Sequence, residues 1–215
     1  MMKKRALFTF ISTITLILNT TLCIASERRF EIDSKLRSRL EEMEKKHLIL
    51  SSSSRDGDVF IVDASGVFSG DLESILQKAA QYDRFVQMEM PHLDISTVVE
   101  RKSNELLYVF SKMSYLMLKS SQYMEVRVSP GVGVDWEMVP KRPHWSFDVS
   151  SSFKRTDGSF YAEKLPSGKI YVRYFMLCDL NVPLTGLLGG LIESSLRSGA
   201  ADVIKILAKE AGFQQ

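Results

Sequence analysis

The chain has 215 residues, of which 45% are hydrophobic and 25% are charged. This composition is typical of one globular domain with a substantial core. The formal net charge at pH 7 is only +2, which does not favour nucleic acid as a partner.

The N-terminus has the layout of a secretory signal. Residues 1–5 are short and basic, residues 6–23 are apolar and uncharged, and Cys23-Ile24-Ala25 is a small-x-small cleavage motif. We predict a signal peptide over residues 1–25 and a periplasmic or secreted mature protein, with an uncleaved membrane anchor as the alternative. The mature chain would keep one cysteine, Cys178, and so could form no internal disulfide.

The next part of the chain predicts helices alternating with two hairpins. An N-terminal helical segment covers residues 26–46, where apolar residues at helical spacing begin at Ile32. A domain from residue 47 to 215 then opens with a hairpin whose turn contains Asp56-Gly57, because that pair accepts positive φ. Asp71 is placed to cap a helix over residues 72–82. A second hairpin joins strands at residues 95–101 and 105–113.

Residues 122–180 alternate between apolar and polar side chains, which is typical of half-buried strands. We predict strands around Met124, Trp136, Phe147 and Tyr174. Turns are expected at residues 131–133, 156–158 and 166–168, each of which contains glycine.

One long amphipathic helix is predicted over residues 183–211. Its apolar stripe follows steps of three and four residues, and consists of Leu188, Ile192, Leu196, Ala200, Val203 and Leu207. Gly189-Gly190 lies within this helix and indicates either close packing against the sheet or a flexible gate.

An antiparallel sheet closed by such a helix predicts an α+β fold with an apolar cavity between the two. Side chains expected to face inward by alternation or helical spacing are the candidate ligand-binding residues: Met124, Val134, Trp136, Met138, Phe147, Val149, Phe160, Leu188, Leu191 and Ile192. Ten methionines are either core filler or an adaptable lining for a hydrophobic ligand.

The sequence offers no catalytic residue that we would assign and no cofactor. His47, His92 and His144 are too far apart to form a metal motif, and no Gly-x-Ser-x-Gly elbow occurs. Asp135 and Glu137 alternate with apolar residues and are expected to face water. Cys178 is better explained as a small buried side chain than as a nucleophile.

Several tyrosines and one histidine are weaker candidates for a ligand contact. Tyr82, Tyr108 and Tyr174 could each offer a hydroxyl inside a cavity, although aromatic residues at core spacing also serve as packing. His92 follows Pro91 and is expected either at a cavity mouth or on the surface.

The order of elements and several strings resemble the START-like (SRPBCC, helix-grip) superfamily of lipid-transfer, polyketide cyclase and coenzyme Q-binding proteins. The strings that carry this resemblance are Ser69–Ile75, Tyr82–Phe85, Met90–Val99, Trp136, Gly158–Pro166, Ile170–Tyr174 and Leu180–Pro183. The resemblance implies a curved antiparallel sheet wrapped around a long C-terminal helix, with a deep apolar cavity. It carries no catalytic residue over to this chain.

Three hypotheses for function remain open. The first is a secreted or periplasmic binding or transfer protein for a lipid or other hydrophobic small molecule, with transient membrane contact left open. The second is a cyclase or dehydratase acting on an apolar substrate, which needs an inward acid, histidine or tyrosine. The third is a structural or interaction protein whose cavity is filled by its own side chains.

Overall fold

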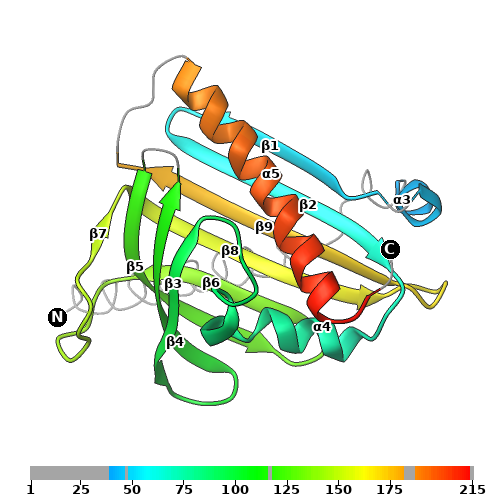
Figure 1. Ribbon diagram of the computed structural model, residues 1–215, viewed down its shortest axis with the longest axis horizontal. Helices are drawn as coiled ribbons and strands as arrows, with labels where there is room; N and C mark the ends of the chain where they lie inside the picture. Colours follow the sequence, from blue (N-terminus) through cyan, green and yellow to red (C-terminus); the bar gives the residue numbers. More distant parts are fainter. Residues whose placement is uncertain (1–38, 47, 116–117, 182–186, 214–215) are drawn as a thin grey trace, which may run out of the picture. The chain divides into compact units, whose positions relative to one another are not determined.

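A computed structural model describes residues 39–46, 48–115, 118–181 and 187–213 (Figure 1). The predicted signal peptide, and the predicted helical segment as far as Ser38, lie outside the described residues. The elements in chain order are α3 (Leu40–Lys46), β1 (Leu50–Asp56), β2 (Val59–Phe68), α4 (Leu72–Ala79), the 3-10 helix η1 (Tyr82–Arg84), β3 (Leu93–Arg101), β4 (Leu106–Tyr115), β5 (Leu118–Ser129), β6 (Gly133–Val139), β7 (Ser150–Ser151), β8 (Phe153–Lys164), β9 (Ile170–Leu180) and α5 (Leu187–Glu210).

One antiparallel sheet forms the body of the domain. Its strand order is β1-β2-β9-β8-β6-β5-β4-β3, and the short β7 pairs with β5. Figure 1 shows β3, β4 and β5 running at a steep angle to β2 and β9, so the sheet curls around one of its faces. Helix α5 packs on β1, β2 and β9, and α4 packs on β6 and β8. We call the face that carries these helices the concave face.

The early elements form for the local reasons expected from the sequence. Gly57 has a φ of 59° in the turn between β1 and β2, a conformation that glycine adopts without steric cost. The Asp71 side chain accepts a 2.8 Å hydrogen bond from the backbone N–H of Ser74 and so caps α4. The second predicted hairpin is present as β3 and β4.

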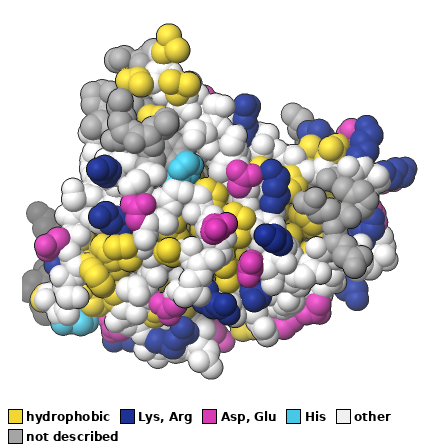
Figure 2. Space-filling view, in the orientation of Figure 1, with side chains coloured by type: hydrophobic (Ala, Val, Ile, Leu, Met, Phe, Trp, Pro, Cys, Tyr) yellow, Lys and Arg dark blue, Asp and Glu magenta, His cyan; other side chains and the backbone are white. Residues whose placement is uncertain are grey.

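The buried stripe of α5 runs through Gly189, Ile192, Leu196 and Ala200. Steps of three and four residues place these positions on one side of the helix. Leu188 and Leu191 each precede a stripe position by one residue, which rotates them about 100° away from the sheet. They are 40% and 54% exposed, and Figure 2 shows hydrophobic side chains gathered where α5 begins.

Two predictions for the middle of the chain are wrong. Residues 156–158 do not form a turn, because they lie inside the long strand β8. Residues 145–149 do not form a strand, and the alternation of Trp145 and Phe147 has a different cause. Both side chains cover the outer, convex face of β4 and β5. Trp145 stacks on Tyr123 with ring centroids 4.4 Å apart.

Polar contacts as well as ring stacking hold Trp145 and Phe147 against β4 and β5. Phe147 stacks on Phe110 at 4.3 Å, and its backbone N–H donates to the Tyr123 hydroxyl at 3.0 Å. Trp145 donates its indole N–H to Glu100 at 3.1 Å. We call Tyr108, Phe110, Tyr123 and Trp145 the convex aromatic cluster.

No helix within the described residues is both long and apolar enough to cross a membrane. Helix α3 belongs to the same compact unit as the sheet and packs on β2. The side chains of Glu44 and Lys169 form an ion pair of 3.7 Å between α3 and the start of β9.

Candidate functional site

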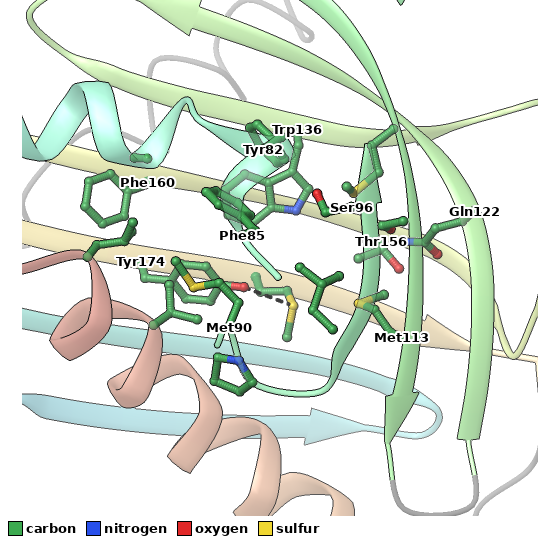
Figure 3. Close-up of a pocket in the computed structure, with 18 residues that line it drawn as sticks. Tyr82, Phe85, Met90, Ser96, Met113, Gln122, Trp136, Thr156, Phe160 and Tyr174 are labelled. Atoms are coloured by element: carbon green, nitrogen blue, oxygen red, sulfur yellow. Dashed lines mark hydrogen bonds between the residues drawn. The ribbon is translucent and has the colours of Figure 1, made fainter. Parts of the chain in front are cut away.

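A cavity of about 130 Å³ lies between the concave face, η1 and the C-terminal half of α5. One buried water needs only about 10–15 Å³ of such space, so the protein's own side chains leave room for a ligand. The sheet supplies Met124, Trp136, Phe160 and Tyr174, and α5 supplies Val203 and Leu207. Figure 3 shows these surroundings as sticks.

The register of strand pairing in the sheet explains why these side chains share one face. Met124 is paired with Met138 across β5 and β6, and Val126 is paired with Trp136. Val134 is paired with Phe160 across β6 and β8. Directly opposite residues in a ladder point to the same side of a sheet. The alternating residues Asp135 and Glu137 therefore point to the convex side, where Glu137 accepts a 2.8 Å hydrogen bond from Arg127.

Gly158 makes room for the indole of Trp136. The two residues are paired across β6 and β8, and a Cβ atom on Gly158 would lie 2.1 Å from the Trp136 ring and 2.5 Å from the Phe175 carbonyl oxygen. Glycine inside a strand often marks such a close approach. The ring centroids of Tyr174 and Trp136 are 5.5 Å apart, so two aromatic side chains pack together in the cavity wall.

The segment between η1 and β3 supplies Phe85, Met90 and Pro91 to the cavity. Glu89 and His92 both have positive φ, at 59° and 62°, and these two residues turn the chain sharply toward β3. His92 is exposed, whereas the neighbouring Pro91 lines the cavity. The cavity wall therefore comes close to the surface at Pro91.

Two tyrosines and one cysteine around the cavity keep their protons at neutral pH. Burial raises the pKa of Tyr82 and of Tyr174 well above the ordinary tyrosine value. Both hydroxyls can therefore donate a hydrogen bond, and Tyr174 donates to the Met176 sulfur at 3.5 Å. Burial, helped by the nearby Asp157, raises the pKa of the Cys178 thiol to about 12, which makes it unreactive.

The described residues that line the cavity are apolar or uncharged polar side chains, together with the two tyrosines. Within the described part of the chain, no group of three or more His, Cys, Asp or Glu side chains could hold a metal ion. The arrangement is suited to binding an uncharged, mainly apolar molecule.

The structure brings three of the ten predicted site residues to the cavity, namely Met124, Trp136 and Phe160. Val134 and Ile192 are buried in the surrounding core, each 1% exposed. Met138 is partly buried and faces the concave side beside Met124 through the ladder.

The other four predicted site residues lie away from the cavity. Phe147 packs on the convex face, as described above, and Val149 is 46% exposed in the same segment. Neither residue lies in a strand, so strand alternation does not bring them to the cavity. Leu188 and Leu191 project from the first turns of α5 for the helical reason given above.

The polar part of the lining was not predicted from the sequence, and it consists of Ser96, Ser111, Gln122 and Thr156. Ser111 and Gln122 alternate with the large aromatic residues Phe110 and Tyr123, so a sequence pattern assigns the aromatic side to the core. Thr156 fell within the predicted turn. One signal was available: Gln122 and Met124 share a face, because they are two residues apart in one strand.

Comparisons with known proteins identify the fold. No family model matches the chain, and no curated protein sequence matches it. The STAR-related lipid transfer protein of Xanthomonas axonopodis superposes with a TM-score of 0.56 at 12% identity, over 75% of this chain and 98% of that one. The chain has the START-like helix-grip fold.

Two further solved structures have the same fold. Human StAR-related lipid transfer protein 5 superposes with a TM-score of 0.51 at 13% identity, over 84% of this chain and 98% of that one. The Zhui aromatase/cyclase from Streptomyces sp. R1128 gives 0.51 at 11% identity, over 71% and 93%. These likenesses confirm the START-like fold class expected from the sequence.

Proposed function

We propose that the protein binds or transfers a lipid or other hydrophobic small molecule in the concave cavity. The observation that carries this proposal is the cavity itself, about 130 Å³ in volume and lined mainly by apolar side chains. An engineered apolar cavity of similar size, about 150 Å³, binds benzene. The cavity therefore takes a small ring or part of a chain as it stands, and a larger lipid would need α5 or the segment at Pro91 to move.

One comparison and one feature of the lining support the same ligand class. The START-like neighbours include proteins named for lipid transfer, and the methionines Met90, Met113 and Met176 line the cavity beside Met124. Methionine adapts to irregular apolar shapes. The volume also argues against a purely structural protein with a filled cavity, because it exceeds the space for one water about tenfold.

We propose further that this binding takes place outside the cytoplasm, in the periplasm or after secretion. The support is the basic, apolar and small-residue order of residues 1–25. Expression of the full chain in a bacterial host, followed by cell fractionation, tests the location. Intact-mass measurement should then give a mature chain that begins at Ser26, and a full-length chain held in the membrane fraction would support the uncleaved anchor.

An enzyme of the cyclase or dehydratase type is the second candidate, because a START-like neighbour is named as an aromatase/cyclase. The groups that could serve it are the hydroxyls of Tyr82 and Tyr174. Their raised pKa keeps both hydroxyls protonated and makes them weak acids, which suits neither a general acid nor a general base near pH 7. We therefore favour binding over catalysis.

Ligand extraction tests the proposed binding directly. The purified protein is extracted with organic solvent, and the extract is compared by mass spectrometry with that of a blocked variant. Val203→Phe adds a ring to a cavity-lining position of α5, and Lys205→Phe adds the same ring to an exposed position of that helix. We expect a hydrophobic compound with the native protein and with Lys205→Phe, and less of it with Val203→Phe. Equal amounts in all three would contradict binding in this cavity.

A further inference from the structure

One end of the cavity is polar, and its polar groups lack partners within the protein. Gln122, Ser111, Thr156 and Ser96 are only 0%, 1%, 3% and 8% exposed. The Gln122 amide nitrogen and the three hydroxyls have no hydrogen-bond partner among the residues that the structure describes. A buried polar group without a partner costs folding free energy, so four at one place call for an explanation.

The ladder brings these groups together. Ser96 on β3 is paired with Ser111 on β4, and Ser111 is paired with Gln122 on β5. Side chains opposite each other in such a ladder have Cβ atoms about 4.5–5.5 Å apart. Figure 3 shows Ser96, Gln122 and Thr156 toward one end of the cavity, and Phe160 toward the other. Thr156 and Phe160 are four residues apart on β8, which corresponds to about 13 Å.

The Gln122 amide nitrogen gives this end a group that can only donate hydrogen bonds. The Ser120 hydroxyl donates to the Gln122 amide oxygen at 3.1 Å, which leaves the amide nitrogen to donate toward the cavity. The hydroxyls of Ser96, Ser111 and Thr156 can each donate or accept. The described lining contains no Lys, Arg or His side chain. An anion buried there would have no cation to offset the loss of its hydration.

We propose that these four side chains bind an uncharged oxygen group, a hydroxyl or a carbonyl, at one end of an otherwise apolar ligand. This inference rests on the proposed binding function and specifies the chemical class of its ligand. The oxygen accepts from the Gln122 amide and from the hydroxyls, and the apolar body of the ligand lies against Trp136, Phe160 and α5. The ligand therefore enters the cavity with its polar end first.

Probes that differ only in the polar group test this assignment. The protein is titrated at pH 7 with 2-naphthol, with 2-methylnaphthalene and with 2-naphthoate, which carry a hydroxyl, a methyl and a carboxylate on the same ring system. We expect 2-naphthol to bind at least about tenfold more tightly than 2-methylnaphthalene, because a site built for a hydroxyl rejects an analogue without one. We expect 2-naphthoate to bind no more tightly than 2-methylnaphthalene.

A nearly isosteric triple variant then removes three of the four polar groups. In the triple variant Ser111→Ala, Gln122→Met, Thr156→Val, we expect 2-methylnaphthalene to bind at least as tightly as 2-naphthol. We also expect a higher Tm for the ligand-free triple variant, because groups without a protein partner have been replaced by apolar ones. The matched control is Ser159→Ala. Ser159 is 2% exposed and alternates with Gly158 and Phe160, so it faces away from the cavity, and its substitution should leave the probe preference unchanged.

The outcomes separate this inference from the function on which it rests. Equal binding of 2-naphthol and 2-methylnaphthalene to the native protein, or tighter binding of 2-naphthoate, would overturn the assignment and leave hydrophobic binding standing. A triple variant that folds and keeps the native preference would overturn it as well. Failure of every probe to bind, together with an extract free of hydrophobic compounds, would overturn both proposals.

Discussion

The two faces of β4 and β5 differ in how completely their polar groups are paired. On the convex face, the hydroxyl of Tyr108 donates to Glu125 at 2.9 Å, and the hydroxyl of Tyr123 donates to the Phe147 carbonyl oxygen at 3.0 Å. On the concave face, the Ser111 hydroxyl and the Gln122 amide nitrogen have no partner among the described residues. The same two strands therefore pair their polar groups on one side and present unpaired polar groups to the cavity on the other.

The convex face carries its own small core. Arg142 lies 3.9 Å from the centroid of the Tyr108 ring, and it also donates to Glu100 at 3.2 Å. The segment that follows β6 thus covers the outside of the sheet with aromatic and charged contacts. A substitution in that segment should change the free energy of unfolding and leave the affinity for a cavity probe unchanged.

Trp145→Ala should have the largest effect on stability. Trp145 is 4% exposed and contacts Tyr108 and Tyr123, so we expect a loss of about 3–5 kcal/mol in the free energy of unfolding. Urea unfolding measures this loss. The affinity for 2-naphthol should stay within about twofold of native, because Trp145 lies on the face of the sheet opposite the cavity. A twofold change corresponds to well under 1 kcal/mol. A large change in probe affinity would show that the two faces are coupled. Phe147→Ala, at a 38% exposed position, should cost less.

Gly158→Ala should act mainly on the concave face. The new methyl group would meet the Trp136 ring and the Phe175 carbonyl oxygen, and overpacking of this kind costs about 1–3 kcal/mol. The indole must shift toward the cavity, so we also expect probe affinity to fall about tenfold, equivalent to about 1.4 kcal/mol. Urea unfolding and probe titration measure the two effects. Native affinity in a destabilised variant would show that Trp136 does not shape the binding space.

Gly190→Ala and Gly189→Ala form a matched pair in α5. A Cβ on Gly190 would have no neighbour within 4 Å, whereas one on Gly189 would lie 1.6 Å from the Arg55 guanidinium. We expect Gly190→Ala to stabilise the protein by up to about 1 kcal/mol through helix propensity, and Gly189→Ala to lose that gain because Arg55 must move. Thermal unfolding measures both variants. Slower uptake of probe by Gly190→Ala in stopped-flow measurements would support the flexible gate, and an unchanged rate would argue against it.

Glu100→Gln should have the smallest effect at neutral pH. The hydrogen bond from Lys102, with further bonds from His144 and Trp145, lowers the pKa of Glu100 to about 2. A lowered pKa gives stability that is present above the ordinary glutamate range and is lost as the pH falls toward 2. The variant should therefore lose less stability than the native protein between pH 5 and pH 2. Glu105→Gln, at an exposed position, is the control, and identical acid profiles for the Glu100 variant and the native protein would contradict this role.

Much of the fold could be predicted because it depends on local patterns. The Asp56-Gly57 turn, the Asp71 cap and the long C-terminal helix depend on residues close together in the chain. Alternation also placed Met124, Trp136 and Phe160 on the face that proves to be concave. It could not decide which of those residues meet the cavity, because that depends on the curl of the sheet and on where α5 crosses it.

The errors share one physical cause. A residue pattern that resembles a turn, strand or helix face can instead reflect a contact with a residue elsewhere in the chain. Gly158 looks like a turn residue, and it is a strand residue that admits the Trp136 indole. Trp145 and Phe147 look like one face of a strand, and they form a cover for rings on β4 and β5. Leu188 looks like part of the helical stripe, but the buried stripe starts one residue later at Gly189, which lies against the Arg55 side chain.

The sequence by itself determined the succession of elements, the α+β class and the face on which most apolar side chains lie, because turn chemistry and periodicity act over a few residues. Only the tertiary structure decided where the cavity lies and that one end of it is polar. Ser96, Ser111 and Gln122 are 15 and 11 residues apart in the chain and form no distinctive sequence motif. They come together in one polar cluster because the register of three strands places them directly opposite one another.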